Sequence, residues 1–179
     1  MSARSKSGII LLFLVLGLPC TSMNSAVSGA PWTLLAASAE ARTKLSTDPI
    51  RVPLVPSTQS STGKDPALEA MVGQRVYLVL DGISAELSAG VSYDVFLGPP
   101  DSSTPAHDDE GYAGTLNFFD IPAEGSGQPH SVSYDVTDAV MHLRQHGRLR
   151  SPLVVTFVPV APPLEKTEPT IARISLVAQ

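Results

Sequence analysis

Short apolar segments separated by glycine, proline and aspartate dominate the pattern of hydrophobic and polar positions along this chain. Residues 75–81 (RVYLVLD) are almost continuously apolar and rich in β-formers, as in a strand buried on both faces. Residues 91–97 (VSYDVFL) alternate, so that the odd-numbered positions share one face. Further strands are expected at 50–55, 112–119, 131–135, 153–159 and 170–177. Because turn residues divide these segments, the pattern predicts an all-β fold, an antiparallel β-sandwich of about seven strands.

One stretch breaks the strand pattern. Val136, Val140 and Leu143 recur at helical spacing. Asp135 stands where it can cap a helix N-terminus, and Gly147 suits the position just past a helix C-terminus. The sequence therefore predicts one short helix that connects two strands of the sandwich.

The chain is expected to divide into three parts. Residues 1–30 carry basic residues and then a short apolar run, the pattern of a secretory signal peptide. Residues 31–70 are rich in small and polar residues, and we interpret them as a flexible lead-in with a short strand at 50–55. Residues 71–179 then form the β-sandwich domain.

The leader predicts export to a periplasmic or extracellular space. Its apolar run is shorter than the roughly twenty residues of a spanning helix, so we expect no stable membrane span after processing. Cys20 leaves open a lipoprotein, and an uncleaved leader would leave a membrane-anchored form. Because Cys20 is the only cysteine, the chain has no intramolecular disulfide and no site built from several thiolates.

Charge and motifs remove several classes of function. The formal net charge is −5 and no basic run is present, so the chain lacks the face that a nucleic-acid backbone requires. No G-x-S-x-G nucleophile elbow and no Cys–His pair is found. We therefore predict no catalytic residue, no cofactor and no nucleic-acid partner.

Two groups of residues could hold a metal ion. His142 and His146 are four apart on the predicted helix, a spacing that lets two imidazoles share one ion. Histidines near a helix C-terminus are also favoured by the helix dipole alone, and the sequence suggests no third ligand. The acidic loop 101–110 could hold Ca²⁺, although it lacks the ordered spacing of a calcium loop and its acids are otherwise solvated.

Aromatic residues gather in and after the segment 112–119. Tyr112, Phe118 and Phe119 fit the core of a sandwich. The functional alternative is that one of them projects from the domain into a cavity of a partner protein. We therefore keep these three as candidate partner-contacting residues.

Six segments resemble the C-terminal domain of tyrosinases and polyphenol oxidases and occur in the same order. They are RVYLVLDGI (75–83), YDVFLGPP (93–100), YAGTLNFFDI (112–121), YDVTDAVMHL (134–143), LVVTFVPV (153–160) and IARISL (171–176). YDVFL is similar to the "KFDV" signature of that domain, with Tyr93 for the aromatic residue and Ser92 in the place of lysine. YAGTLNFF resembles the family segment F-A-G-S-F. The resemblance runs from about residue 49 to the end.

The resemblance implies a role as a shield. In that family two copper ions, each held by three histidines, oxidise phenols to quinones, and the C-terminal β-sandwich lies over the copper entrance and keeps the enzyme latent. This chain has four histidines and cannot supply six ligands. The resemblance thus implies a non-catalytic domain that shields, inhibits or stabilises a separately encoded type 3 copper phenol oxidase.

Two other interpretations stay open. The same sandwich could be an exported binding module for carbohydrate or for another surface protein. Alternatively, it could deliver copper through His142 and His146, joined by His107 or His130.

Overall fold

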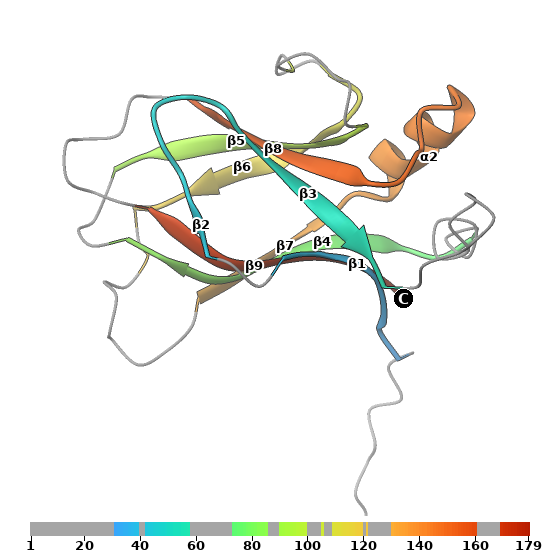
Figure 1. Ribbon diagram of the computed structural model, residues 1–179, viewed down its shortest axis with the longest axis horizontal. Helices are drawn as coiled ribbons and strands as arrows, with labels where there is room; N and C mark the ends of the chain where they lie inside the picture. The colour runs from blue at the N-terminus through green and yellow to red at the C-terminus, as the bar shows by residue number, and fades with distance from the viewer. Residues whose placement is uncertain are drawn as a thin grey trace, which may run out of the picture.

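Nine strands and one helix are found in the part of the chain that the structure describes (Figure 1). The computed structural model describes residues 31–39, 42–57, 73–85, 90–99, 105, 109–119, 121, 130–160 and 169–179. The strands are β1 (Thr33–Ser38), β2 (Thr43–Lys44), β3 (Ile50–Pro56), β4 (Val76–Ser84), β5 (Ser92–Gly98), β6 (Tyr112–Asn117), β7 (His130–Asp135), β8 (Leu153–Pro159) and β9 (Thr170–Ala178). The helix is α2 (Thr137–Gln145). The predicted signal peptide at 1–30 lies outside the described residues.

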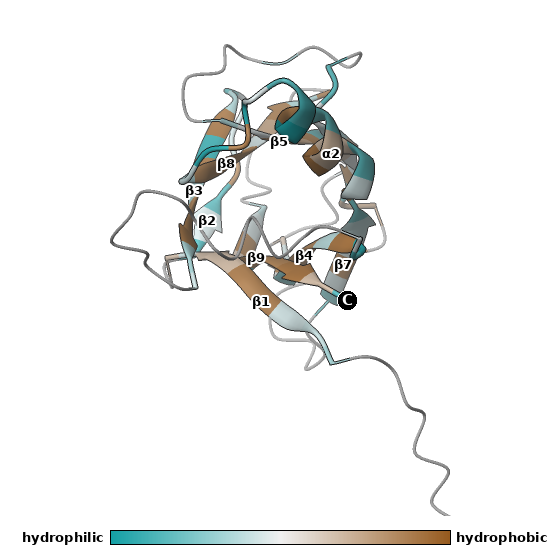
Figure 2. Cartoon of the chain, turned by 90° about the vertical axis from the view of Figure 1, so that its right-hand side faces the viewer, coloured by the Kyte–Doolittle hydropathy of each residue, from teal (hydrophilic) through white to brown (hydrophobic). Residues whose placement is uncertain are grey.

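All the strands belong to one continuous antiparallel sheet. Its order is β6-β5-β8-β3-β1-β9-β4-β7, and β2 pairs with β9 beside this path. The sheet curls until its two end strands, β6 and β7, contact each other. The strands thus form a nearly closed barrel, which Figure 2 shows end-on. The predicted all-β class with one short helix is confirmed. The two layers of the predicted sandwich are the two halves of this one sheet, because β3, β1 and β9 connect them by hydrogen bonds.

The segment expected to be a flexible lead-in contributes three strands to this sheet. β1 pairs with β3 on one side and with β9 on the other, and its Leu35 and Ala36 are buried. The strand predicted at 50–55 is found as β3, whereas β1 and β2 were not predicted, so the sheet begins before the predicted boundary at residue 71. Residues 58–70 lie outside the described residues. A bulge between Leu34 and Ala36 interrupts the inward–outward alternation, so β1 lacks the period of two that marks a strand in a sequence.

Strand β4 shows how the two faces of the sheet differ. Val76, Leu78 and Leu80 point inward and are at most 1% exposed. Tyr77 and Val79, between them, lie on the outer face and are only half-buried. The prediction that this strand is buried on both faces is wrong, because one side of a barrel wall faces solvent.

The interior of the barrel is a single apolar core. The odd-numbered positions of 91–97 all point into it, as their alternation predicted. The largest fully buried side chains are Tyr93, Phe118, Phe157, Leu35, Leu54, Leu78, Leu80, Leu97, Leu116, Ile171, Ile174 and Leu176. Full burial of each such side chain contributes about 1.5–3 kcal/mol, so this core is the main favourable contribution to folding.

Helix α2 connects β7 to β8 and buries Ala139, Val140 and Leu143 against the barrel. It ends as predicted at Gly147, whose φ is +64° and whose amide donates to the carbonyl of Arg144 over 3.0 Å. Within the described ranges, no helix is long and apolar enough to cross a bilayer.

The start of α2 differs in detail from the prediction. Val136, not Asp135, occupies the N-cap position. Asp135 precedes it and accepts hydrogen bonds from the amide and the hydroxyl of Thr137, over 3.0 and 2.6 Å. These bonds hold the pKa of Asp135 below its ordinary value. Asp135 therefore stabilises the first turn of the helix, but it does so as the residue before the N-cap and not as the N-cap itself.

The two edge strands of the barrel, β6 and β7, contact each other where the ring of Tyr134 packs on Gly114. A Cβ atom at Gly114 of β6 would lie 2.6 Å from two ring carbons of Tyr134 of β7. The φ of Gly114 is +152°, a value that other residues rarely adopt. In the described chain β6 and β7 form no hydrogen-bonded ladder with each other, so this contact joins the two edges.

We expect Gly114→Ala to destabilise the domain, because the new methyl group must displace the Tyr134 ring. The free energy of unfolding should fall by about 2–4 kcal/mol in urea denaturation, because overpacking adds to the strain of a side chain at positive φ. Gly147→Ala is the control, since it also has a positive φ but meets no atom within 4 Å, and it should cost about 1 kcal/mol. Equal losses for the two variants would contradict the role of the ring contact.

Two buried tyrosine hydroxyls, those of Tyr93 and Tyr134, have no hydrogen-bond partner among the described residues. Burial raises the pKa of each to about 12, and for Tyr134 the nearby Tyr112 adds to the effect. The folded state therefore favours the neutral phenol. This contribution to stability is complete below about pH 10, the ordinary pKa of tyrosine, and is lost as the pH rises towards 12.

Tyr93→Phe should raise the free energy of unfolding by about 1 kcal/mol at pH 7, because it removes an unsatisfied buried hydroxyl. It should also make the loss of stability between about pH 10 and 12 less steep. Urea denaturation at pH 7 and at several pH values between about 10 and 12 measures these effects. Tyr112→Phe is the control of opposite sign, since its hydroxyl lies 2.8 Å from that of Thr115. A destabilised Tyr93→Phe would show that the hydroxyl is satisfied.

Candidate functional site

The three aromatic residues predicted to meet a partner have different environments. Tyr112 is half-buried, with its ring 5.5 Å from that of Phe96 and its hydroxyl 2.8 Å from that of Thr115. The Thr115 hydroxyl in turn donates to Asp94 over 2.7 Å. Tyr112 thus belongs to a set of side chains that joins β5 to β6 on the outer face of the barrel.

Phe118 and Phe119 are separated by the alternation of the chain. The amide of Phe118 donates to the carbonyl of Val91 over 3.0 Å, and its side chain is fully buried with its ring edge-on to Tyr93 at 6.0 Å. Phe118 is a core residue, so its selection as a partner contact is corrected. Phe119, the next residue, is 57% exposed. Its place as a partner contact stays a prediction.

Phe119 and a second exposed apolar residue, Val160, follow the two strands that flank β5. Val160 is 58% exposed and follows β8, where its amide donates to the carbonyl of Ser92 over 2.9 Å. Phe119 follows β6, which pairs with the other side of β5. We call Phe119 and Val160 together the apolar pair. They lie at the end of the barrel where β5 begins, away from α2.

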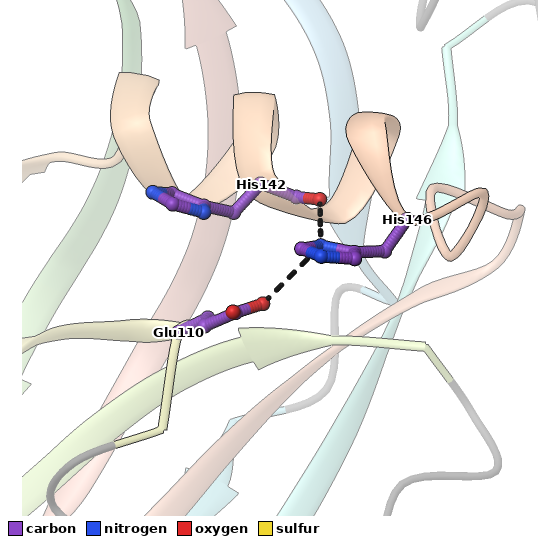
Figure 3. A group of neighbouring side chains, drawn as sticks. All are labelled: Glu110, His142 and His146. Carbon is purple, nitrogen blue, oxygen red and sulfur yellow. Dashed lines mark hydrogen bonds and ion pairs between the residues drawn. The ribbon is translucent and has the colours of Figure 1, made fainter.

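The opposite end of the barrel carries a cluster of possible metal ligands. Glu110, His142 and His146 each offer one ligand atom, and these atoms lie within 4.8 Å of one another. Figure 3 shows the two histidines side by side on α2, with the carboxylate of Glu110 directed towards His146. The Nδ1 atom of His146 lies 3.4 Å from Glu110 Oε2 and 3.0 Å from the carbonyl oxygen of His142. All three side chains are exposed.

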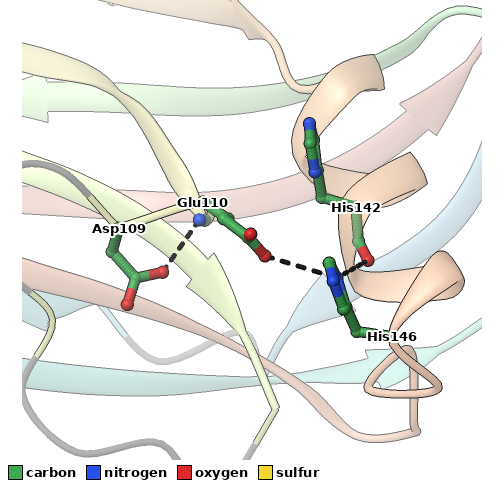
Figure 4. Close-up of polar contacts among 5 residues, drawn as sticks. Asp109, Glu110, His142 and His146 are labelled. Atoms are coloured by element: carbon green, nitrogen blue, oxygen red, sulfur yellow. Dashed lines mark hydrogen bonds and ion pairs between the residues drawn. The ribbon is translucent and has the colours of Figure 1, made fainter.

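Each member of the cluster is positioned by its own element. The spacing of four residues places both histidines on one face of α2. Glu110 lies in the turn before β6, where the Asp109 carboxylate accepts the amide of Gly111 over 2.9 Å (Figure 4). The amide of Tyr112 also donates to the carbonyl of Asp109 over 3.0 Å. A side chain at Gly111 would collide with the carbonyl oxygen of Leu97, so glycine is required there.

The cluster supplies the third ligand that the sequence did not suggest. Glu110 was considered only within the acidic loop 101–110, as an oxygen ligand for Ca²⁺. In the structure Asp109 accepts a hydrogen bond within the turn, and Glu110 lies close to the two histidines. His130 lies on β7 outside this group, and His107 lies outside the described residues. Distance in the sequence concealed the contact between Glu110 and His146.

A groove of roughly 500 Å³ lies on the outer face of β1, β9, β4 and β7. Trp32, 55% exposed, stands at its edge with its ring 5.2 Å from that of Tyr77. Polar side chains line another part of the groove, four residues along β4 from Tyr77, where Ser131 donates to Asp81 over 2.7 Å and Asp81 is paired in register with Arg173. The remaining lining residues are Leu34, Val79, Val132, Ser133, Ser175 and Val177. The groove therefore combines an aromatic surface with hydrogen-bonding groups.

Fold and surface together define a small antiparallel β-barrel domain whose distinctive side chains lie at its two ends and in one outer groove. The chain belongs to the family described as "Domain of unknown function (DUF7868)", whose sequence profile matches residues 31–179. That range includes β1, in agreement with its place in the sheet. No curated protein sequence shows significant similarity to the chain.

Tyrosinases and polyphenol oxidases, the enzymes whose C-terminal domain the sequence segments resemble, are among the solved structures that match the chain. Latent apple tyrosinase is 21% identical with a TM-score of 0.49, and the match covers 78% of this chain and 28% of that one. Recombinantly expressed latent aurone synthase, a polyphenol oxidase, is 15% identical with a TM-score of 0.47, over 76% of this chain and 25% of that one. The chain thus spans about a quarter of the length of these enzymes.

Proposed function

We propose that this domain catalyses no reaction itself and binds a separately encoded type 3 copper phenol oxidase, which it shields or stabilises. Two features of the sequence support the proposal. Six ordered segments resemble the C-terminal domain of tyrosinases and polyphenol oxidases, and the four histidines of the chain are too few for a dinuclear copper site. The domain would be exported together with its partner.

The observation that carries the proposal is the exposure of Phe119. This residue ends the segment that resembles F-A-G-S-F, and it is 57% exposed while its neighbour Phe118 is fully buried. A large exposed aromatic side chain, with the exposed Val160 across β5 from it, can fill an apolar depression on a partner, and such anchors supply most of the affinity of protein interfaces. We place the contact with the oxidase at the apolar pair.

A separate shield must bind without the help of a covalent tether. In a fused enzyme the tether keeps the shield at a high effective concentration, whereas a free domain must rely on its interface. Such an interface buries at least about 1,000 Å² in total. The apolar pair would therefore form the centre of a larger contact made with polar residues around it.

We expect the purified domain to slow phenol oxidation by the tyrosinase of the same organism, and to co-elute with it on size exclusion at micromolar concentration. Phe119→Ser should weaken inhibition at least about tenfold, because it removes the anchor. Met141→Ser is the matched control: Met141 is 49% exposed on α2, away from the apolar pair, and its loss should leave inhibition unchanged.

Two results would contradict the proposal. One is the absence of both a complex and an effect on the oxidation rate. The other is an equal loss of inhibition in Phe119→Ser and Met141→Ser, which would mean that the apolar pair is not the contact.

A second candidate function is supported by the outer groove. Trp32 offers a ring for stacking, and Asp81, Ser131 and Arg173 offer hydrogen bonds further along the same groove. An aromatic platform next to polar groups suits an oligosaccharide, whose pyranose rings have apolar faces and hydroxyl edges. In this case the domain would be a carbohydrate-binding module, and the apolar pair would not be needed.

Tryptophan emission separates the two candidates, because Trp32 is the only tryptophan of the chain. If the groove binds carbohydrate, titration with soluble oligosaccharides should change the emission, and Trp32→Ala should abolish binding measured by calorimetry. Phe119→Ser should bind oligosaccharide normally. Unchanged emission and no heat across a panel of oligosaccharides would eliminate this candidate.

A further inference from the structure

The end of the barrel next to α2 joins three metal-ligating side chains that are far apart in the sequence. His142 and His146 come from the helix, and Glu110 comes from the turn before β6. These elements approach each other only because the barrel brings the turn at residues 109–111 next to the C-terminal end of α2 (Figure 4).

We propose that Glu110, His142 and His146 bind one divalent cation of borderline character, Zn²⁺ or Cu²⁺. Two imidazole nitrogens and one carboxylate oxygen are the ligands that such ions prefer. Three protein ligands leave a fourth position for water or for a group of another molecule. Ca²⁺ and Mg²⁺ would bind poorly, because they require several oxygen ligands and this cluster has one carboxylate.

The geometry is close to that of a metal site and can close further. Ligand atoms around a tetrahedral Zn²⁺ lie about 3.3 Å apart, given metal–ligand distances of about 2.0–2.1 Å. The three candidate atoms lie within 4.8 Å of one another. The Nδ1 atom of His146 lies 3.4 Å from Glu110 Oε2 and 3.0 Å from the carbonyl oxygen of His142. Because that oxygen can only accept a hydrogen bond, an ion bound at Nδ1 must replace this bond, whereas an ion bound at Nε2 leaves it in place. The side chains of His146 and Glu110 are 53% and 50% exposed, so small rotations meet little steric resistance.

The backbone around the cluster is more firmly held than its side chains. The bond between Asp109 and the Gly111 amide fixes the turn that carries Glu110. The helix end that carries His146 is fixed by the bonds of Gly147 to Arg144 and of Arg148 to Leu143, over 3.0 and 2.7 Å. A bound ion would therefore link α2 to the connection between β5 and β6. Because an ion that binds only the folded state stabilises it, metal should raise the thermal midpoint.

Calorimetric titration of ZnCl₂ and of CuCl₂ into the metal-free protein, prepared without a histidine tag, tests this site. We expect one ion per chain and a higher thermal midpoint with metal. His142→Gln, His146→Gln and Glu110→Gln should each weaken binding at least about tenfold. CaCl₂ should give no comparable binding.

His130→Gln is the matched control, since it removes an imidazole outside the cluster and should not change the affinity. The proposal is overturned if neither metal binds more tightly than about 1 mM, a weak affinity on the usual scale. It is also overturned if Glu110→Gln binds as well as the unmodified chain, or if His130→Gln weakens binding as much as the ligand variants. These measurements need no oxidase, so their outcome is independent of the function proposed above.

Discussion

The position of β9 is the constraint on which the rest of the structure depends. This C-terminal strand lies between β1 and β4, and it also pairs with β2. Among the described residues, it is the only strand that pairs the half of the sheet formed by β6, β5, β8, β3 and β1 with β4, and through β4 with β7. Its Ile171, Ile174 and Leu176 are fully buried, so the same strand joins the halves and fills the core. The curvature that brings both β6 to β7 and Glu110 to α2 follows from this continuity.

The sequence predicted most of this fold because its information is local. Apolar alternation located β5, and the spacing of Val140 and Leu143 together with Gly147 located α2. The failures are also local in origin. A bulge and small residues concealed β1, and Tyr77 and Val79 made β4 look buried on both faces although they line the outside of a barrel. Whether apolar strands form two sheets or one curled sheet depends on pairings that no single segment encodes.

The candidate sites were less predictable because they depend on contacts between distant segments. The helical spacing predicted that His142 and His146 share a face, but only the folded barrel adds Glu110. The sequence grouped Tyr112, Phe118 and Phe119 as core residues of which one could project, and it did not show which of them faces the core. The hydrogen bond from Phe118 to Val91 decides this, since it extends the pairing of β6 with β5. Trp32 was assigned to a loose segment, so its groove was not foreseen.

The central claim is that the end of the barrel at the apolar pair docks on a type 3 copper oxidase. Hydrogen–deuterium exchange of the domain with and without the oxidase tests it most directly, because it reports on each segment in the intact complex. The account predicts slower exchange at residues 90–92 and 117–119 and around Val160, with little change in α2. Protection confined to α2 or to the outer groove, or no protection anywhere at saturating oxidase, would contradict it.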